Sequence, residues 1–254
     1  MKKVSIFILF IFSIWIISCN SSSKKTEEEI VALETDEVEK SIPEISLFSF
    51  EEKNEYPDAI LEMYSPLGNQ VFRPGKVPFE FNIKNFPFEG GIGGFQLKMI
   101  LNGSDPVGYN SPIFQRELKE GTYRAVAYLI DSEGLALKSF GNYVDRDFRV
   151  GDTRPFPYQA EPYIALNLPN NNQEYQEGEA VTIDFLLLGG EIDLDKLKVR
   201  IELNELQYEV EEVNPVRVLN LPKGEYQLSV VLLKQDGREL DGPFSMVRKS
   251  IVIR

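Results

Sequence analysis

The stretch Leu118-Lys119-Glu120-Gly121-Thr122-Tyr123 returns 103 residues later as Leu221-Pro222-Lys223-Gly224-Glu225-Tyr226. Each copy leads into a segment in which every second residue is apolar, the pattern of a strand with one buried face. The alternating residues are Ala125, Ala127 and Leu129 in the first copy, and Leu228, Val230 and Leu232 in the second. This shared register predicts two copies of one structural unit.

An earlier part of the repeat supports the same division. Residues 65–75 and 168–178 share a turn pattern, and a strand with period-two alternation follows each. The shared turn residues are Pro66, Asn69, Gln70, Phe72 and Gly75 in the first copy, and Pro169, Asn172, Gln173, Tyr175 and Gly178 in the second. We expect the alternating residues to form the cores, namely Val77, Phe79, Phe81, Ile83, Val181, Ile183, Phe185 and Leu187.

The spacing Leu-x-x-Gly-x-Tyr resembles the tyrosine corner of Greek-key sandwiches, in which the tyrosine hydroxyl bonds to upstream backbone. Short strands, frequent turn signals and the lack of a convincing long helix predict an all-β fold. Residues 57–254 resemble the bacterial immunoglobulin-like modules, because residues 65–75 approximate the first turn of that family. The resemblance implies two tandem Ig-like Greek-key β-sandwiches and says almost nothing of function. A glycine-rich segment at residues 85–95 lacks the histidines that a subgroup of the family has there.

The expected division has five parts. Residues 1–18 form a lipoprotein signal peptide, and residues 19–56 hold an acylated cysteine and a disordered acidic linker. Residues 57–150 form the first sandwich, residues 151–157 a proline-rich joint, and residues 158–254 the second sandwich. Prolines make such a joint semi-rigid.

The amino terminus predicts export. Two lysines precede an apolar run that is too short to span a bilayer but suits a signal peptide. The run ends in Ile16-Ile17-Ser18-Cys19, which resembles the bacterial lipobox and contains the only cysteine of the chain. We therefore expect lipidation (palmitate) at Cys19, with an ordinary secretory peptide or a short signal anchor as the alternative. By resemblance to enterobacterial lipoproteins, in which Asp after the lipidated cysteine retains the protein in the inner membrane, Asn20 favours passage to the outer membrane.

The segment that follows reads as a tether. Residues 20–56 contain eleven acidic and four basic residues, and this charge disfavours collapse. The early acidic cluster resembles the surface-export signals of some Bacteroidetes lipoproteins, and a solvated spacer is the alternative. Spacing allows a short helix over residues 27–40. Residues 47–50 are more apolar than a free spacer, so they should dock on the first module or add an edge strand.

Composition excludes several classes of function. The net charge of −13 disfavours nucleic acid and an anionic membrane surface. The absence of histidine and of a second cysteine removes His-based nucleophile pairs, His/Cys zinc sites and internal disulfides. No catalytic residue, cofactor or resident metal is expected, although a carboxylate-based hydrolase stays a remote alternative.

Two weak candidate sites remain. Phe86, Phe88 and Phe95 flank four glycines and could present rings to a protein or glycan, or else fold onto the end of the sandwich. Carboxylate pairs occur at residues 145/147, 193/195 and 211/212, and calcium between the modules would need several such oxygens to converge. The calcium candidates are Asp131, Asp152, Asp193 and Asp195.

These observations favour a non-enzymatic, membrane-anchored envelope lipoprotein of the bacterial surface that presents two modules for binding or adhesion. The alternative is a periplasm-facing structural or accessory subunit of an envelope complex. The expected partners are the membrane, through Cys19, and an unknown protein or glycan ligand.

Overall fold

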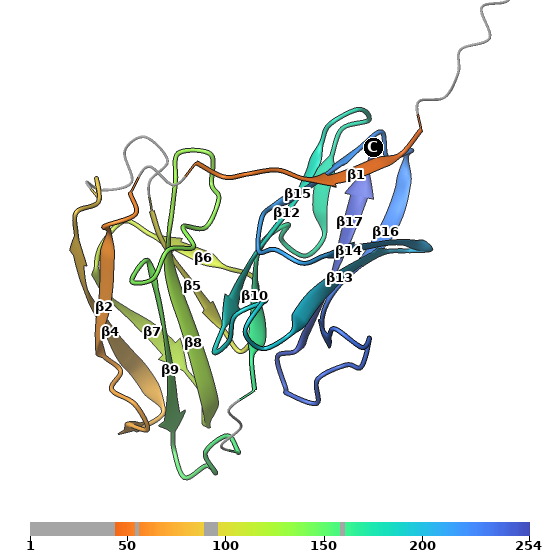
Figure 1. Ribbon diagram of the computed structural model, residues 1–254. Helices are drawn as coiled ribbons and strands as arrows, with labels where there is room; N and C mark the ends of the chain where they lie inside the picture. The colour runs from red at the N-terminus through yellow and green to blue at the C-terminus, as the bar shows by residue number, and fades with distance from the viewer. Residues whose placement is uncertain (1–43, 54–55, 89–95, 158–160) are drawn as a thin grey trace, which may run out of the picture. The chain divides into compact units, whose positions relative to one another are not determined.

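The computed structural model describes residues 44–53, 56–88, 96–157 and 161–254, and every regular element in those ranges is a strand (Figure 1). Residues 42–254 form one compact unit. The prediction of an all-β sandwich fold is confirmed.

The first sandwich comprises eight strands in two sheets. One sheet has the order β2-β4-β7 and the other β3-β9-β8-β5-β6. All neighbours are antiparallel except β3 and β9, which are parallel. The strands are β2 (Ile60–Ser65), β3 (Val71–Phe72), β4 (Gly75–Lys84), β5 (Gln96–Leu101), β6 (Val107–Tyr109), β7 (Ile113–Leu118), β8 (Gly121–Ile130) and β9 (Tyr143–Val150).

The second sandwich repeats this arrangement and has one additional strand. Its sheets have the orders β10-β12-β15-β1 and β11-β17-β16-β13-β14, and β11 and β17 are the parallel pair. The strands are β1 (Ser46–Ser49), β10 (Tyr163–Leu168), β11 (Gln173–Tyr175), β12 (Val181–Leu188), β13 (Leu197–Leu203), β14 (Leu206–Val210), β15 (Val216–Leu219), β16 (Gly224–Lys234) and β17 (Met246–Ile253).

Each sandwich has its own core, built from the alternating residues that the repeat predicts. Val77, Phe79 and Phe81 are buried in the first core with Ala125, Ala127 and Leu129, while Ile83 is only partly buried. The corresponding residues of the second copy are all buried in the second core. Their burial follows from strand geometry, since every second side chain points to the same face.

The two copies also share their local contacts. The Tyr123 hydroxyl donates to the Lys119 carbonyl over 2.9 Å, and the Tyr226 hydroxyl donates to the Pro222 carbonyl over 2.8 Å. Both tyrosine corners are therefore confirmed. In the turns, Gln70 Oε1 accepts the Leu67 N–H and Gln173 Oε1 accepts the Asn170 N–H.

Strand β1 lies inside the segment predicted as a linker (residues 19–56). It pairs antiparallel with β15, with Leu47 opposite Val218, and Ile45 and Leu47 pack on the second core (Figure 1). Apolar burial and ladder hydrogen bonds explain why these residues join a sheet rather than a spacer. An edge strand was one of the two expectations for residues 47–50. Its host is the second sandwich, not the first.

Candidate functional site

A third apolar cluster joins the two sandwiches. From the first come side chains of β5, β8 and the following turn, and from the second come side chains of β10 and β12. The buried members are Ile100, Val126, Tyr128, Ile130, Ala136, Tyr163, Ala165, Leu186 and Leu188. Because alternate residues of β8 and β12 fill the cores, these strands are buried on both faces. We call this cluster and its polar contacts the junction.

Two fully buried polar side chains, Asn167 of β10 and Asp184 of β12, lie at the junction. Asn167 Nδ2 donates to Asp184 Oδ2 over 2.7 Å and to the Gly134 carbonyl over 2.7 Å. Asn167 Oδ1 accepts the Tyr128 hydroxyl over 3.0 Å and Lys98 Nζ over 2.9 Å. Since buried polar groups are tolerated when they are paired, these bonds specify how the first sandwich contacts the second.

A buried ion-pair network continues from Asp184. Lys138 Nζ lies 2.7 Å from Asp184 Oδ1 and 2.7 Å from Glu52 Oε2, just after β1. Burial lowers the pKa of Lys138, but attraction to Asp184 and Glu52 outweighs this, so its pKa is raised. Burial raises the pKa of Glu52, and Lys138 opposes that shift only in part. Residues 46–52 thus connect β15 of one sandwich with Lys138 of the other.

The predicted carboxylate pair Asp145/Asp147 on β9 is fully engaged. Asp147 accepts Arg124 Nε and Nη2, each over 2.7 Å, and Asp145 Oδ2 accepts the Tyr163 hydroxyl over 2.8 Å. The Arg124 guanidinium carbon lies 4.6 Å from the Tyr163 ring centroid and 5.2 Å from that of Phe244. These carboxylates therefore hold the junction together through an arginine that stacks on aromatic rings.

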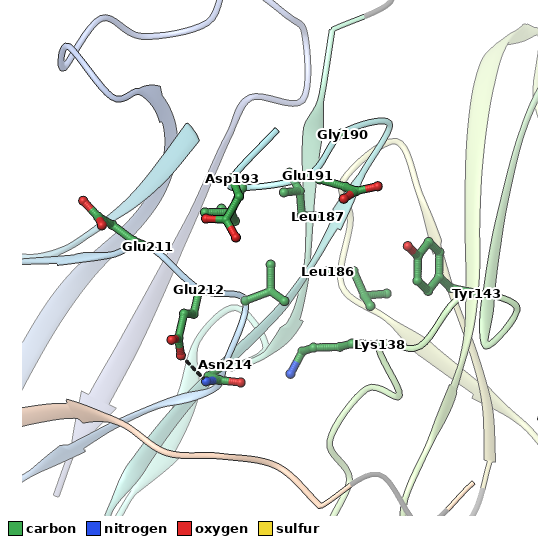
Figure 2. A pocket seen from close by; sticks show the side chains of 12 residues that line it. Lys138, Tyr143, Leu186, Leu187, Gly190, Glu191, Asp193, Glu211, Glu212 and Asn214 are labelled. Carbon is green, nitrogen blue, oxygen red and sulfur yellow. Dashed lines mark hydrogen bonds between the residues drawn. The ribbon is translucent and has the colours of Figure 1, made fainter. Parts of the chain in front are cut away.

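A pocket of about 390 Å³ opens across the junction (Figure 2). The first sandwich contributes Lys138 and Tyr143, and the remaining side chains come from the second. These are Leu186, Leu187, Gly190, Glu191, Ile192, Asp193, Glu211, Glu212, Val213 and Asn214. Pockets at module interfaces are common ligand sites because both walls are preformed.

The pocket lining combines apolar side chains with carboxylates. Figure 2 shows Leu187 beside Asp193 and Glu191, and Leu186 between Glu191 and Lys138. Glu212 Oε2 accepts Asn214 Nδ2 over 2.5 Å. The lining suits a ligand with an apolar body and a cationic or hydrogen-bond-donating group.

The calcium candidates lie on three separate loops, and Asp193 and Asp195 share one of them. Asp131 Oδ1 accepts the backbone N–H groups of Glu133 and Leu135, and Asp195 Oδ2 accepts that of Glu191. Asp152 is exposed after β9, and Asp193 lines the pocket. Within the described ranges, no group of three or more His, Cys, Asp or Glu side chains is placed to hold a metal ion.

Two of the three candidate aromatic rings fold against the first sandwich. Phe86 packs edge-on against Tyr56 with centroids 5.4 Å apart, and Phe86 and Phe88 both contact the first core. This matches the alternative in which the rings cover the end of the sandwich. Phe95 and the four glycines lie outside the described residues, as do Cys19 and the predicted helix at residues 27–40.

The polar residues of the junction were not predicted from the sequence. Asn167 and Asp184 interrupt the otherwise apolar runs of β10 and β12, at residues 163–168 and 181–188. A polar residue inside a strand that is buried on both faces signals a hydrogen-bonded network, and this signal was available. Nothing local marked Lys138 or Glu52, because their partners are distant in sequence.

No described residues form a helix that is long and apolar enough to cross a membrane.

Comparisons with known proteins identify no family. No family model and no curated protein matches the chain. Among solved structures, the fibronectin(III)-like modules of Clostridium thermocellum CbhA are 14% identical, with 77% of this chain and 94% of that chain covered and a TM-score of 0.30. Three N-terminal domains of the highly immunogenic outer capsid protein (Hoc) of bacteriophage RB49 are 8% identical, with 77% and 69% covered and a TM-score of 0.24. The sheets themselves carry the assignment to the Ig-like β-sandwich fold.

Proposed function

We propose that the protein is a non-enzymatic binding lipoprotein of the bacterial envelope, anchored through Cys19, that presents its two sandwiches as one fixed unit. The single observation that carries this proposal is the junction. Its nine buried apolar residues and its paired buried polar groups give the two modules a shared interior. A fixed pair of modules keeps the walls of the junction pocket in place for a ligand.

The proposed ligand contact is the junction pocket, where carboxylates surround an apolar wall. The chain contains no histidine, so its side chains cannot form a Ser-His or Cys-His nucleophile pair. Binding rather than catalysis is therefore the proposed use of this pocket. A structural subunit of an envelope complex remains the alternative, and the same experiment separates the two.

The test begins with location. Protease treatment of intact cells, with a periplasmic control protein, shows whether the modules face the medium. The Cys19→Ser variant should lose incorporation of a palmitate analogue and move to the soluble fraction. Retained labelling of that variant would contradict anchoring at this residue.

Binding is then tested with the full chain against arrays of glycans, host proteins and envelope components. Asp193→Lys reverses a charge in the lining of the pocket, whereas Glu205→Lys makes the same change at an exposed position between β13 and β14. Binding that Asp193→Lys weakens and Glu205→Lys leaves intact supports the pocket. Equal binding of the ligand to both variants and the unchanged protein would overturn the proposed role of the pocket. Co-purification with a fixed set of envelope partners, without ligand binding, would also overturn it.

A further inference from the structure

The two sandwiches differ at one sheet edge. Strand β15 of the second sandwich is paired on both sides, by β12 and by β1. Strand β7 of the first sandwich pairs with β4 only, and no other described strand lies along its second side. The repeat therefore holds one filled and one open position for an additional strand.

The two strands occupy equivalent positions, as their registers show. Val77 lies opposite Arg116 in the first sandwich, and its repeat partner Val181 lies opposite Val218 in the second. Arg116 and Val218 are therefore equivalent. By the same registers, Gln115 of β7 corresponds to Arg217 of β15, and Glu117 corresponds to Leu219.

The hydrogen-bond phase of the open edge follows from two bonds. Phe81 N–H donates to the Pro112 carbonyl, so even-numbered residues of β7 face β4. Phe50 N–H donates to the Pro215 carbonyl, so odd-numbered residues of β15 face β1. The backbone groups of Gln115 and Glu117 thus point to the open side, in the phase that β15 uses to hold β1.

The side chains near the edge show what a further strand would cover. In the second sandwich, Val216 and Val218 are fully buried beneath Leu47 of β1. At the equivalent position of β7, Phe114 is only half-buried and stacks on Tyr109 with centroids 3.6 Å apart. By the registers, the position of Leu47 lies opposite Arg116, which bonds the Tyr109 hydroxyl, so an aliphatic side chain there would cover the stem of Arg116 beside these rings.

Two features protect part of this edge. Ser111 Oγ bonds the N–H and the carbonyl of Ile113 and closes one end. Beyond it, residues 114–118 contain no proline and no lysine, and their one inward-facing charge, Arg116, donates through Nη1 to the Tyr109 hydroxyl over 2.6 Å. Glu117 is exposed on the outward face. Its equivalent in β15, Leu219, lies opposite Ser46 of β1, so a basic residue at the position of Ser46 in an added strand would complement the charge of Glu117.

We propose that the β7 edge of the first sandwich accepts an extended segment of a partner polypeptide as a fourth, antiparallel strand. The segment carries an aliphatic residue at the inward position and a basic residue opposite Glu117. This mode of recognition takes affinity from backbone hydrogen bonds and specificity from alternate side chains. The proposal rests on the proposed binding role and gives that role a class of partner at a surface separate from the pocket.

The test uses a labelled peptide that copies residues 44–51 with Ser46→Lys, added to the full chain in detergent. The expected result is saturable binding with protection of the Gln115 and Glu117 amides from hydrogen exchange. N-methylation of the peptide at Phe48 removes an N–H that would point to β7, and it should weaken binding at least about tenfold. N-methylation at Leu47, whose N–H points away, is the matched control and should change binding little.

Two protein variants complete the test. Gln115→Pro removes the outward N–H without removing a bond to β4, and it should abolish binding while the circular dichroism spectrum is unchanged. Glu117→Lys should weaken binding of the lysine peptide. Equal binding of the two N-methylated peptides, protection at β15 through displacement of β1, or no binding at millimolar peptide would overturn the proposal. Asp193→Lys should leave peptide binding intact, so a failure of the pocket is distinguishable from a failure of the edge.

Discussion

Asp184 connects the two sandwiches, and Asp184→Asn should destabilise the protein strongly. The carboxylate is fully buried and accepts hydrogen bonds from Asn167 Nδ2 and the Ala136 N–H. It also forms an ion pair with Lys138. Asparagine keeps the size of the side chain and can still accept the first two bonds. It removes the negative charge beside Lys138, which is then left with Glu52 alone.

The magnitude follows from that uncompensated charge. Breaking a buried ion pair by removal of one partner costs about 3–5 kcal/mol. Because Glu52 still neutralises Lys138 in part, we expect a loss near the lower limit, about 3 kcal/mol in the free energy of unfolding. For a unit of this size, each kcal/mol lowers the melting temperature by about 2–4 °C, so the expected decrease is about 6–12 °C.

Urea denaturation followed by circular dichroism measures this loss. A double-mutant cycle with Lys138→Met isolates the contribution of the ion pair. In the Lys138→Met protein, Asp184→Asn no longer leaves a buried cation beside an amide. The double variant should therefore lose clearly less than the sum of the single variants, with a coupling energy of about 1–3 kcal/mol. Additive losses, or a loss below about 0.5 kcal/mol for Asp184→Asn, would refute the assigned role of the network.

Three further predictions concern the corners, the titrating groups and β1. Tyr226→Phe and Tyr123→Phe should each lower the free energy of unfolding by about 1 kcal/mol in thermal denaturation, while Tyr208→Phe, whose hydroxyl bonds no other described residue, should change it little. Burial raises the pKa of Tyr128 and Tyr163 in the folded state, so the unfolded chain loses these protons at a lower pH. The free energy of unfolding should therefore be constant below about pH 10 and fall as the pH rises further, with a smaller fall in Tyr128→Phe. A flat profile above about pH 10 would contradict this assignment. Leu47→Asp places a charge against the second core and should release β1, seen as faster hydrogen exchange at the Arg217 and Leu219 amides, whereas Phe48→Asp on the exposed face should not.

The sequence predicted the features that depend on local pattern. The tyrosine corners, the alternating core residues of β4, β8, β12 and β16, and the all-β fold all follow from spacing within one copy of the repeat. These features need only the chain direction and the two-residue period of a strand, so no distant contact has to be known.

The junction could not be predicted in the same way. Alternation assigns Ala125, Ala127 and Leu129 to one face and leaves Val126, Tyr128 and Ile130 for solvent, although they are buried. The unbroken apolar run of residues 125–130 was the available signal that both faces are covered. The host of β1 had no such signal, because an extended apolar segment fits the edge of either sandwich until the register of the partner is known.

The polar groups of the junction explain why the two sandwiches act as one unit. Apolar side chains alone would tolerate several relative positions, since apolar contact is not directional. Asn167 and Asp184 need Tyr128, Gly134, Ala136 and Lys138 at hydrogen-bonding distance, and a shift between the sandwiches would leave buried polar groups unpaired. Glu52 adds a contact from the segment after β1, which is itself fixed to β15. Residues 46–52 therefore contact both sandwiches, through β15 of the second and Lys138 of the first.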